Sequence, residues 1–424
     1  MHLCSRRFFP FFSTFFLGAF NDNMFRNALV ILITYQSGLE PGRASALSFL
    51  AMALLMVPQF FFSSIAGEIA DKYPQQTLFR AIKLAEVVLM ALTLAAFLAG
   101  SISSLLILIF LMGTQSAFFS PVKYAYVPRT LPDELIHANG LVGAGTYLAI
   151  LLGAVAGNVF ITCGNGKLVT GLFLLAVAGL GYLASLKVPA SVPVSSGLKL
   201  NWNILSGTWD ILKIVFRDFT LRHCTLGLSI FWMAGALYVS QLAGFCREII
   251  GANESLVMTF TLLFSAGVGL GSYLCSLFRK NANVLAAVSP ALVLMGLFTL
   301  DLFFASGSWT KPCGDGVYAN LSTLIRIPSF WRFTADLLLL AACGGFYSVP
   351  LISLLQKTAE PGVMARVVAG NNIINAAMIA FGTVCSAVLM NTGLLNVRGI
   401  FLLVAAVNIL AALYLLPLRK SGRI

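Results

Sequence analysis

Residues 8–36 read FFPFFSTFFLGAFNDNMFRNALVILITYQ, an apolar stretch that is broken near its centre by polar side chains. A helix that spans a bilayer needs about 20 mostly apolar residues, so this stretch is long enough to cross. Ionisable side chains inside such a segment are costly and mark a functional site by default. We therefore predict a polar site on a helix that lines a transport pathway, made of Asn21, Asp22, Asn23 and Arg26.

A simpler interpretation of Asp22 and Arg26 is also open. They stand four positions apart, which places both on one face of a helix. Paired there, they would neutralise one another and only hold neighbouring helices together. So many polar groups so close together are a high cost for structure alone, and the functional interpretation is favoured.

Outside this segment the chain continues in the same manner. It is 59% hydrophobic and 10% charged, with a mean hydropathy of +0.91, whereas soluble domains carry roughly 25% charged residues. We expect an all-α integral membrane protein with twelve transmembrane helices and almost no soluble domain. The expected helices are 8–36, 44–66, 79–100, 103–120, 137–160, 168–188, 221–249, 254–278, 283–306, 333–355, 363–388 and 397–417.

The net charge of +12 is distributed by side rather than clustered. Of the 27 Lys and Arg residues, nineteen fall in loops on the side of the N-terminus, seven on the other side, and Arg26 within the first stretch. Cytoplasmic loops carry such an excess, which predicts that both termini are cytoplasmic. The basic residues then serve topology and anionic headgroups, and no nucleic-acid partner is expected.

The largest interruption on the cytoplasmic side is 189–220, which begins with Pro and Ser residues typical of a linker. Residues 202–217 then form an amphipathic stretch that we expect to lie in the membrane interface. This linker divides the chain into two six-helix halves, 1–188 and 221–424. Transporters built from repeats have this layout, with the substrate site between the halves near the midplane.

The segment Gly67-Glu68-Ile69-Ala70-Asp71-Lys72 resembles the signature loop of the major facilitator superfamily. It departs from that pattern afterwards, where Pro74, Gln75 and Gln76 replace a Gly and a basic pair. Together with twelve helices and a central linker, the resemblance predicts the superfamily fold. It implies that Gly67, Asp71 and Lys72 form a loop that controls conformational change.

Other polar side chains inside the expected helices are candidates for a pathway. Lys123 follows Pro121 and either meets a substrate phosphate or reaches the cytoplasmic surface. The remaining candidates are Trp232, Tyr238, Asn371 and Asn375, which alternatively only pack or hydrogen-bond between helices. Two charge pairs, Lys83 with Glu86 and Arg332 with Asp336, are spaced to pair locally, and for both we favour a structural role.

Chemistry of other kinds has no support in the sequence. There is no nucleophile–base pattern, no phosphate-binding loop and no cluster of Cys and His with metal-ligand spacing. We expect no enzymatic activity, no cofactor and no metal.

Several motifs together resemble the bacterial lysophospholipid transporter family. They are Phe16-Leu17-Gly18-Ala19-Phe20-Asn21-Asp22-Asn23, Phe119-Ser120-Pro121-Val122-Lys123-Tyr124, Ala138-Asn139-Gly140-Leu141, Gly344-Gly345-Phe346-Tyr347-Ser348-Val349-Pro350-Leu351, Leu354-Leu355-Gln356 and Ala369-Gly370-Asn371. The resemblance implies a multi-pass flippase of the bacterial inner membrane that moves lysophospholipids, such as lysophosphatidylethanolamine, inward for reacylation. It places Asp22, Asn23, Lys123, Asn139 and Asn371 on the family's polar signature. Family members have an Arg where this chain has Val239.

The alternatives to lysophospholipid transport are two. One is a cation-coupled exporter of drugs or small metabolites, and the other is a non-transporting membrane partner of an acyltransferase. For the favoured function we expect a monomer in the lipid bilayer, with a separate acyltransferase as a possible partner. The lipid should enter sideways, and Gly153, Ala154 and Gly157 would let the seam between the fifth and eighth helices open, unless these glycines only permit tight packing.

Overall fold

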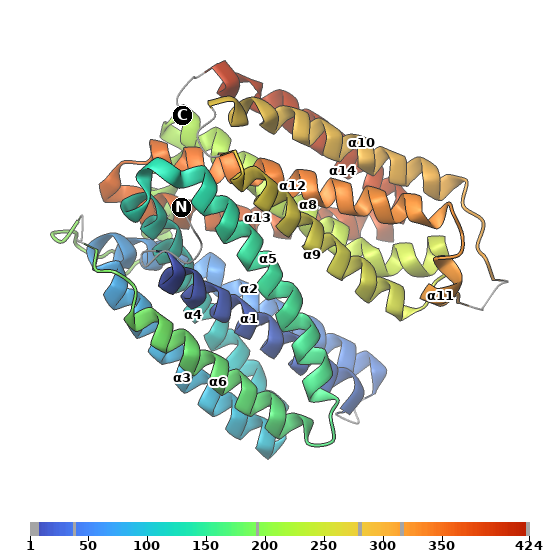
Figure 1. Cartoon of the computed structure of the whole chain (residues 1–424), viewed down its shortest axis with the longest axis horizontal. Helices are drawn as coiled ribbons and strands as arrows, with labels where there is room; N and C mark the ends of the chain where they lie inside the picture. The colour runs from blue at the N-terminus through green and yellow to red at the C-terminus, as the bar shows by residue number, and fades with distance from the viewer. Residues whose placement is uncertain (1–7, 37–39, 192–194, 279–281, 314–317, 421–424) are drawn as a thin grey trace. The chain divides into compact units, whose positions relative to one another are not determined.

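The computed structural model describes residues 8–36, 40–191, 195–278, 282–313 and 318–420. Of the basic residues that support the topology, Arg6, Arg7, Arg279, Lys280 and Arg423 lie outside these ranges. The described chain is helical, apart from one isolated β-bridge between Ala252 and Ala319 (Figure 1).

A long helix lies at each of the twelve apolar stretches in the described part of the chain. The long helices are α1 (Phe9–Ile31), α2 (Pro41–Lys72), α3 (Gln75–Ala99), α4 (Ile102–Thr130), α5 (Leu135–Ile161), α6 (Gly166–Leu186), α8 (Phe219–Gly244), α9 (Glu254–Ser276), α10 (Val288–Gly307), α12 (Phe330–Thr358), α13 (Met364–Asn391) and α14 (Val397–Lys420). Two others are shorter: α7 (Ile204–Arg217) and α11 (Leu321–Leu324). Short π-helical or 3-10 segments cover Leu32–Gln36, Pro132–Glu134, Phe245–Ile250, Ala282–Ala287 and Pro361–Val363.

Eleven helices in the described residues are long and apolar enough to cross a membrane. Helix α1 is not among them, although it has 23 residues. Its polar cluster around Asp22 lowers the mean hydropathy of a segment that is otherwise rich in Phe. The prediction of an all-helical membrane protein is confirmed.

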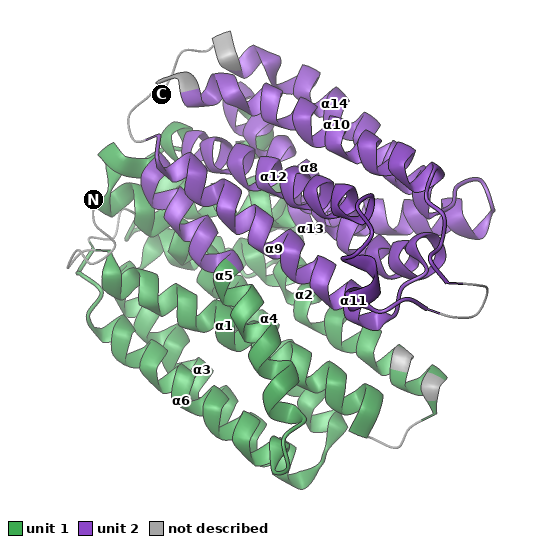
Figure 2. Ribbon diagram, turned by 45° about the vertical axis from the view of Figure 1, so that its right-hand side comes forward, with its two compact units in different colours: residues 1–135, 148–218, 356–373 green, residues 136–147, 219–355, 374–424 purple. Residues whose placement is uncertain are grey.

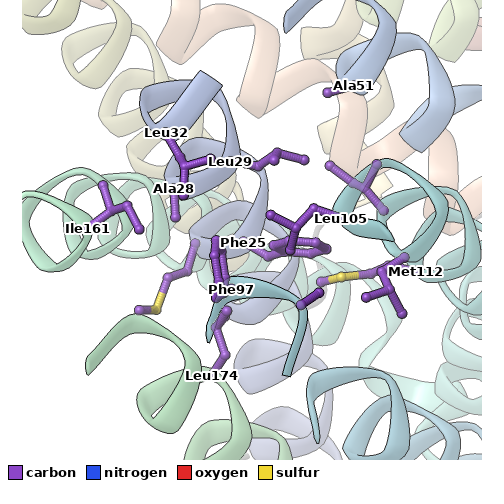
Figure 3. Close-up of a cluster of buried hydrophobic side chains, with 14 of the residues drawn as sticks. Phe25, Ala28, Leu29, Leu32, Ala51, Phe97, Leu105, Met112, Ile161 and Leu174 are labelled. Atoms are coloured by element: carbon purple, nitrogen blue, oxygen red, sulfur yellow. The ribbon is translucent and has the colours of Figure 1, made fainter. Parts of the chain in front are cut away.

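The chain forms two compact units, coloured separately in Figure 2. Unit 1 comprises residues 1–135, 148–218 and 356–373. In it α2 packs on α4, and α3 packs on both α4 and α6, while α1 lies against α6. Figure 3 shows its buried apolar cluster, in which Phe25 and Leu29 of α1 meet Phe97 of α3 and Met112 of α4.

Unit 2 comprises residues 136–147, 219–355 and 374–424. In it α10 packs along α14, and α8 contacts both α14 and α9. Phe245 stacks edge-on against Phe333 and Phe401, with ring centroids 5.6 and 5.2 Å apart. Helices α5 and α13 each contribute residues to both units.

Two expected helix ends differ from the structure. Helix α2 continues through the whole signature segment to Lys72, so Gly67, Asp71 and Lys72 form its last turns rather than a loop. Helix α4 continues through Pro121 and Pro128 to Thr130. Prolines are tolerated inside membrane helices because neighbouring groups satisfy the backbone carbonyls that they free. Lys123 therefore lies within a helix and not at the end of one.

The fifth and eighth expected helices are α5 and α9. The expectation that Gly153 and Gly157 let a seam between these two helices open is wrong. Both glycines of α5 face α1 within unit 1. A Cβ at Gly153 would lie 3.2 Å from Asn23 Cβ, and one at Gly157 would lie 3.2 Å from Asn27 Cβ. Small residues at such positions let two helices approach closely, which is a packing role.

Candidate functional site

Helix α3 carries a buried pair of opposite charges in unit 1. Lys83 Nζ lies 2.6 Å from Glu86 Oε2, and the two side chains are 0% and 1% exposed. A Cβ at Gly18 of α1 would collide with the Lys83 ammonium, so this glycine provides the space that the side chain occupies. The Lys83 ammonium also lies 5.1 Å from the centre of the Phe119 ring. A buried pair of this kind is stable only when further hydrogen bonds satisfy both ions.

Glu86 obtains those hydrogen bonds from two other helices. Asn21 Nδ2 of α1 donates to its Oε1 at 3.2 Å, and Gln115 Nε2 of α4 donates to its Oε2 at 3.1 Å. Ser116 Oγ lies 3.3 Å from Gln115 Oε1 and donates to Asp22 Oδ2 at 2.5 Å. We call this group the polar network; its members are Asn21, Asp22, Lys83, Glu86, Gln115 and Ser116.

Hydrogen-bonding capacity remains unused in the α1 part of the polar network. Within the described structure, Asp22 Oδ1 and Asn21 Oδ1 are buried and accept no hydrogen bond. Arg26 interacts with Asp22 electrostatically but makes no salt bridge to it within 4 Å among the described residues, so the direct pair of the simpler interpretation does not form. Asn23 turns back on its own helix and donates to Ala19 O at 2.8 Å. Asp22 can therefore accept a further donor, such as a substrate ammonium.

Lys123 of α4 is a cation without an acidic partner. Its Nζ lies 4.4 Å from the ring centre of Tyr124 and 5.6 Å from that of Phe15 on α1. The side chain is half-buried, and its ammonium makes no ion pair or hydrogen bond in the described residues. Phe15 and Asp22 are seven positions apart on α1, which corresponds to about 10 Å along the helix axis. The Lys123 ammonium and the open oxygen of Asp22 thus lie beside residues about two turns apart on α1, both in unit 1.

Asp71 binds the start of α13. Its Oδ1 accepts from Ala365 N at 3.0 Å and from Arg129 Nη2 at 3.2 Å, and its Oδ2 accepts from Arg366 N and Nε at 3.2 and 3.3 Å. A carboxylate at a helix N-terminus satisfies free backbone N–H groups and is favoured by the helix dipole. Gly67 allows the approach, because a Cβ there would lie 2.7 Å from Ala369 Cβ. We call these contacts the Asp71 clamp; Lys72 points instead to the ring of Tyr73.

The remaining candidates of unit 1 lie on α13. Asn371 is buried, and its Oδ1 accepts no hydrogen bond in the described structure. Its neighbour Asn372, which was not selected from the sequence, donates from Nδ2 to Ser120 Oγ of α4 at 2.9 Å. Asn371 therefore joins Asn21 and Gln75 as buried amides of unit 1 with an open acceptor in the described structure.

The candidates of unit 2 lie in separate places and share no hydrogen bond with one another. Tyr238 is buried, its hydroxyl 2.6 Å from Thr299 Oγ1 and accepting from Asn408 Nδ2 at 3.0 Å. Asn375 Oδ1 accepts from Ser229 Oγ at 2.7 Å, and Asn139 Nδ2 donates to Ser353 Oγ at 3.0 Å. Trp232 is 39% exposed and packs edge-on against Phe231. Tyr238, Asn139 and Asn375 thus join helices, and a structural role accounts for their contacts.

The prediction that Arg332 pairs with Asp336 is wrong. Arg332 pairs with Asp301 of α10, through Nε at 2.7 Å and through Nη2, and not with Asp336 of its own helix. Arg332 and Phe333 also border a cavity of about 310 Å³ next to Trp309 in unit 2. Asp301 binds the guanidinium of Arg332 because both of its carboxylate oxygens accept hydrogen bonds from the planar guanidinium group.

Sequence reasoning selected only Asn21 and Asp22 from the polar network as site residues. Lys83 and Glu86 were interpreted as a local pair, which they are, but their burial inside an apolar segment already indicated more. Gln115 and Ser116 carried no signal of their own, because single amides and hydroxyls are common in membrane helices. Only the packing of α1, α3 and α4 brings these residues to Asp22.

Comparisons with known proteins agree with this architecture. The chain is 26% identical over 378 residues to a lysophospholipid transporter of Serratia proteamaculans (strain 568), covering 86% of this chain and 83% of that protein. It is 26% identical over 360 residues to one from Yersinia pestis (strain Pestoides F), covering 82% and 78%.

Solved structures share the fold. A human organic anion transporter superposes with a TM-score of 0.72 at 15% identity, covering 97% of this chain and 99% of that one. The fucose:proton symporter of E. coli gives a TM-score of 0.68 at 15% identity, with 97% of each chain covered. The Major Facilitator Superfamily profile matches residues 11–383, which is most of the sequence. The chain belongs to the Major Facilitator Superfamily.

Proposed function

We propose that this secondary transporter moves lysophospholipids across the inner membrane of a bacterium, from the outer to the inner leaflet. Its superfamily consists of multi-pass membrane transporters and not of enzymes. The substrate class is supported by similarity at 26% identity to proteins named as lysophospholipid transporters, over most of both chains. In this function the chain supplies substrate for reacylation by a separate acyltransferase.

The observation that carries the proposal is the pair of unused charges in unit 1. A lysophosphatidylethanolamine head carries one phosphate anion and one ammonium cation. Lys123, without an acidic partner, is suited to the phosphate, and the open Oδ1 of Asp22 is suited to the ammonium. Hydrogen bonds to charged groups contribute about 1.5–3 kcal/mol each, so two such contacts distinguish this head from an uncharged solute.

The single acyl chain explains why so few polar groups suffice. Exposing it to water would cost about 0.8 kcal/mol per CH₂, far more than headgroup contacts return. We infer that the head enters the polar site while the chain stays against apolar side chains or lipid. A sugar would need many more amide and carboxylate partners, since each unpaired hydroxyl costs stability.

The Asp71 clamp supplies the moving part in this proposal. Helix α2 belongs to the proposed half 1–188 and α13 to the proposed half 221–424. Alternating access in repeat-built transporters moves one half against the other around a fixed site. Breaking and remaking the contacts of Asp71 with Ala365 and Arg366 would therefore accompany each cycle.

Leaflet-resolved uptake in proteoliposomes tests the proposed substrate. Labelled lysophosphatidylethanolamine is added to the outer leaflet, and the label that becomes protected from extraction by albumin is measured over time. We expect protein-dependent inward movement, which excess unlabelled lysophospholipid slows and diacyl phospholipid does not. The matched control is protein-free liposomes of the same composition.

If no movement above the control is seen under any ion gradient, the substrate proposal is wrong. Uptake or extrusion of a soluble amine or drug under a cation gradient would then favour the exporter alternative. Neither result would change the family assignment, which rests on the profile match.

A further inference from the structure

Helix α7 has three distinct stripes along its 14 residues. At about 100° per residue, Gly207, Ile211 and Val215 fall on one face, and all three are buried. Next to it, the apolar flank of Leu205, Trp209 and Phe216 is 82%, 62% and 42% exposed. The third stripe is polar and exposed, and it contains Ser206, Asp210, Lys213 and Arg217. The buried face explains only part of the apolar surface of this helix.

The buried face of α7 bridges the two helices of the Asp71 clamp. Ile211 and Val215 cover Gly370 of α13, where a Cβ would lie 2.9 Å from a methyl of each. On the other side, Gly207 faces Ser64 of α2, and α7 and α2 are in contact. The arm leading into α7 is also held, because Asn201 N donates to Glu68 Oε2 of α2 at 2.6 Å.

The linker before α7 reaches the same two helices. Ser195 N donates to Asp71 O at 3.3 Å, and Ser195 Oγ donates to Gly362 O at 3.0 Å, just before α13. All of these residues belong to unit 1. The segment 195–217 is therefore connected to both partners of the clamp.

The position of α7 along α2 places it near a membrane surface. Helix α2 has 32 residues, which is about 48 Å of helix, whereas the hydrocarbon core is about 30 Å thick. Ser64 lies eight positions before the end of α2, or about 12 Å along its axis. The buried face of α7 thus contacts α2 at roughly the depth where headgroups meet acyl chains.

The exposed apolar flank is suited to that boundary. Large apolar side chains lying in the interface, with basic residues at the polar edge, are typical of helices that bind a membrane surface. Trp209 belongs to the residue type enriched at this level, and Lys213 and Arg217 lie on the adjoining edge.

We propose that α7 is a membrane-bound arm whose apolar flank inserts at the headgroup boundary of the bilayer, with Lys213 and Arg217 against anionic headgroups. The lipid surface then holds α7 against Ser64 and Gly370 and favours the closed Asp71 clamp. The partner is the bilayer itself, so this inference does not depend on which substrate is transported.

Fluorescence quenching of Trp209 tests whether the apolar flank of α7 inserts into the bilayer. In the full-length protein, Trp202, Trp232, Trp309 and Trp331 are replaced by Phe, leaving Trp209 alone. The protein is reconstituted in phosphatidylcholine liposomes containing phosphatidylglycerol. We expect Trp209 to be quenched by lipids brominated near the headgroup end of the chain and protected from aqueous iodide. As a matched control, Asp210→Trp in the Trp-free chain places the same reporter on the polar edge, where iodide should quench it.

A distance measurement tests the coupling to the clamp. Spin labels are attached in a cysteine-free chain at Tyr73→Cys and Glu360→Cys, both at exposed positions beside the clamp. In liposomes containing phosphatidylglycerol, we expect a single short distance between the two spin labels when the flank is native. The population of molecules with that short distance should be lost when Leu205, Trp209 and Phe216 are all replaced by Ser. Removing phosphatidylglycerol should reduce the same population.

Three outcomes would overturn the proposal in whole or in part. If iodide quenches Trp209 as strongly as the reporter at position 210, the flank is in water. If neither iodide nor brominated lipid quenches it, protein covers the flank, and a second copy of the chain or another subunit is the occupant. If the distance between the spin labels is unchanged in the triple variant and insensitive to phosphatidylglycerol, α7 does not control the Asp71 clamp, even when Trp209 lies in lipid.

Discussion

Asp22 is the residue on which the proposed transport depends most. Its Oδ2 is fixed by Ser116 while Oδ1 stays open in a buried site. Replacing it by Asn keeps the shape but removes the charge that would meet a substrate ammonium. We expect Asp22→Asn to insert normally and to lower the lysophospholipid uptake rate roughly ten- to a hundredfold, the loss of one charge-assisted hydrogen bond.

The uptake assay needs a control for loss of negative charge in general. Glu254 at the start of α9 is exposed, so Glu254→Gln should leave the rate unchanged at equal protein amounts. Unchanged uptake in Asp22→Asn would show that the carboxylate is structural or dispensable.

Lys83 and Glu86 should behave as one unit in stability. Glu86→Gln alone leaves the buried Lys83 ammonium without its counter-ion, which costs about 3–5 kcal/mol when a buried pair is broken. The double variant Lys83→Met with Glu86→Gln removes both charges and should recover most of that loss. The measurement is thermal unfolding of the purified protein in detergent, for both single variants and the double variant. Equal destabilisation in all three would contradict a coupled pair.

Single residues show where sequence reasoning ends. Pairing of Lys83 with Glu86 was predictable from their spacing on one helix. Pairing of Arg332 with Asp301 was not, because the carboxylate comes from another helix. Asp22 was selected correctly as a buried polar residue, yet its partner is Ser116 of α4 and not Arg26. Spacing along one helix identifies partners one turn away. It cannot show whether a residue on another helix, brought close by packing, is the preferred partner.

At the scale of elements, the Asp71 clamp joins the end of α2 to the start of α13. Asp71→Asn keeps the side-chain size but weakens four charge-assisted hydrogen bonds to α13 and Arg129. We expect the clamp to open more often, which would expose the buried Ala369. In a cysteine-free chain carrying Ala369→Cys, labelling by a soluble maleimide should be about tenfold faster with Asp71→Asn.

Lys72→Gln is the matched comparison, because Lys72 lies beside Tyr73 and, in the part of the chain that the structure describes, makes no hydrogen bond or ion pair with α13. Its labelling rate at position 369 should stay near that of the parent. If Lys72→Gln accelerates labelling as much as Asp71→Asn, the clamp is kept closed by the general charge of this region and not by the specific hydrogen bonds of Asp71 to the start of α13.

Element positions were predictable, and element ends were less so. Hydropathy located a helix at each of the twelve stretches, because a spanning helix must be both long and apolar. It placed the end of the second helix at 66, whereas α2 ends at Lys72. Beyond the hydrocarbon, polar residues such as Asp71 continue a helix when another element satisfies them, and hydropathy carries no information about that element.

At the scale of the whole molecule, orientation in the membrane is the prediction open to the simplest test. The bias of nineteen basic residues to seven predicts that both termini are cytoplasmic. A fluorescent reporter fused after Ile424 should be cytoplasmic, and an epitope inserted within 311–326 should be reached from outside in intact cells. The opposite labelling at both sites would invert the orientation, and the same side for both would contradict an even number of spans.

The fold could be predicted at this scale, and the substrate could not. Twelve apolar stretches, a central linker and the segment 67–72 were enough to favour the superfamily fold, which the profile match confirms. The division into halves at 189–220 stays a prediction. In the proposed function, substrate choice depends on which charges remain unpaired after packing, as for Lys123 and the Oδ1 of Asp22, and that is a property of the assembled helices.

The polarity of α1 also has a consequence for biogenesis. This helix is made before α3 and α4, yet it lacks the hydropathy of the eleven others. Asp22 and Arg26 each oppose insertion by about 2.5–3.5 kcal/mol near a helix centre, whereas each Phe or Leu returns only about 0.3–0.6. A nascent chain holding α1 alone is therefore poorly retained by the bilayer. Its secure integration waits for the translocon to deliver α3 and α4, whose Glu86 and Ser116 receive Asn21 and Asp22.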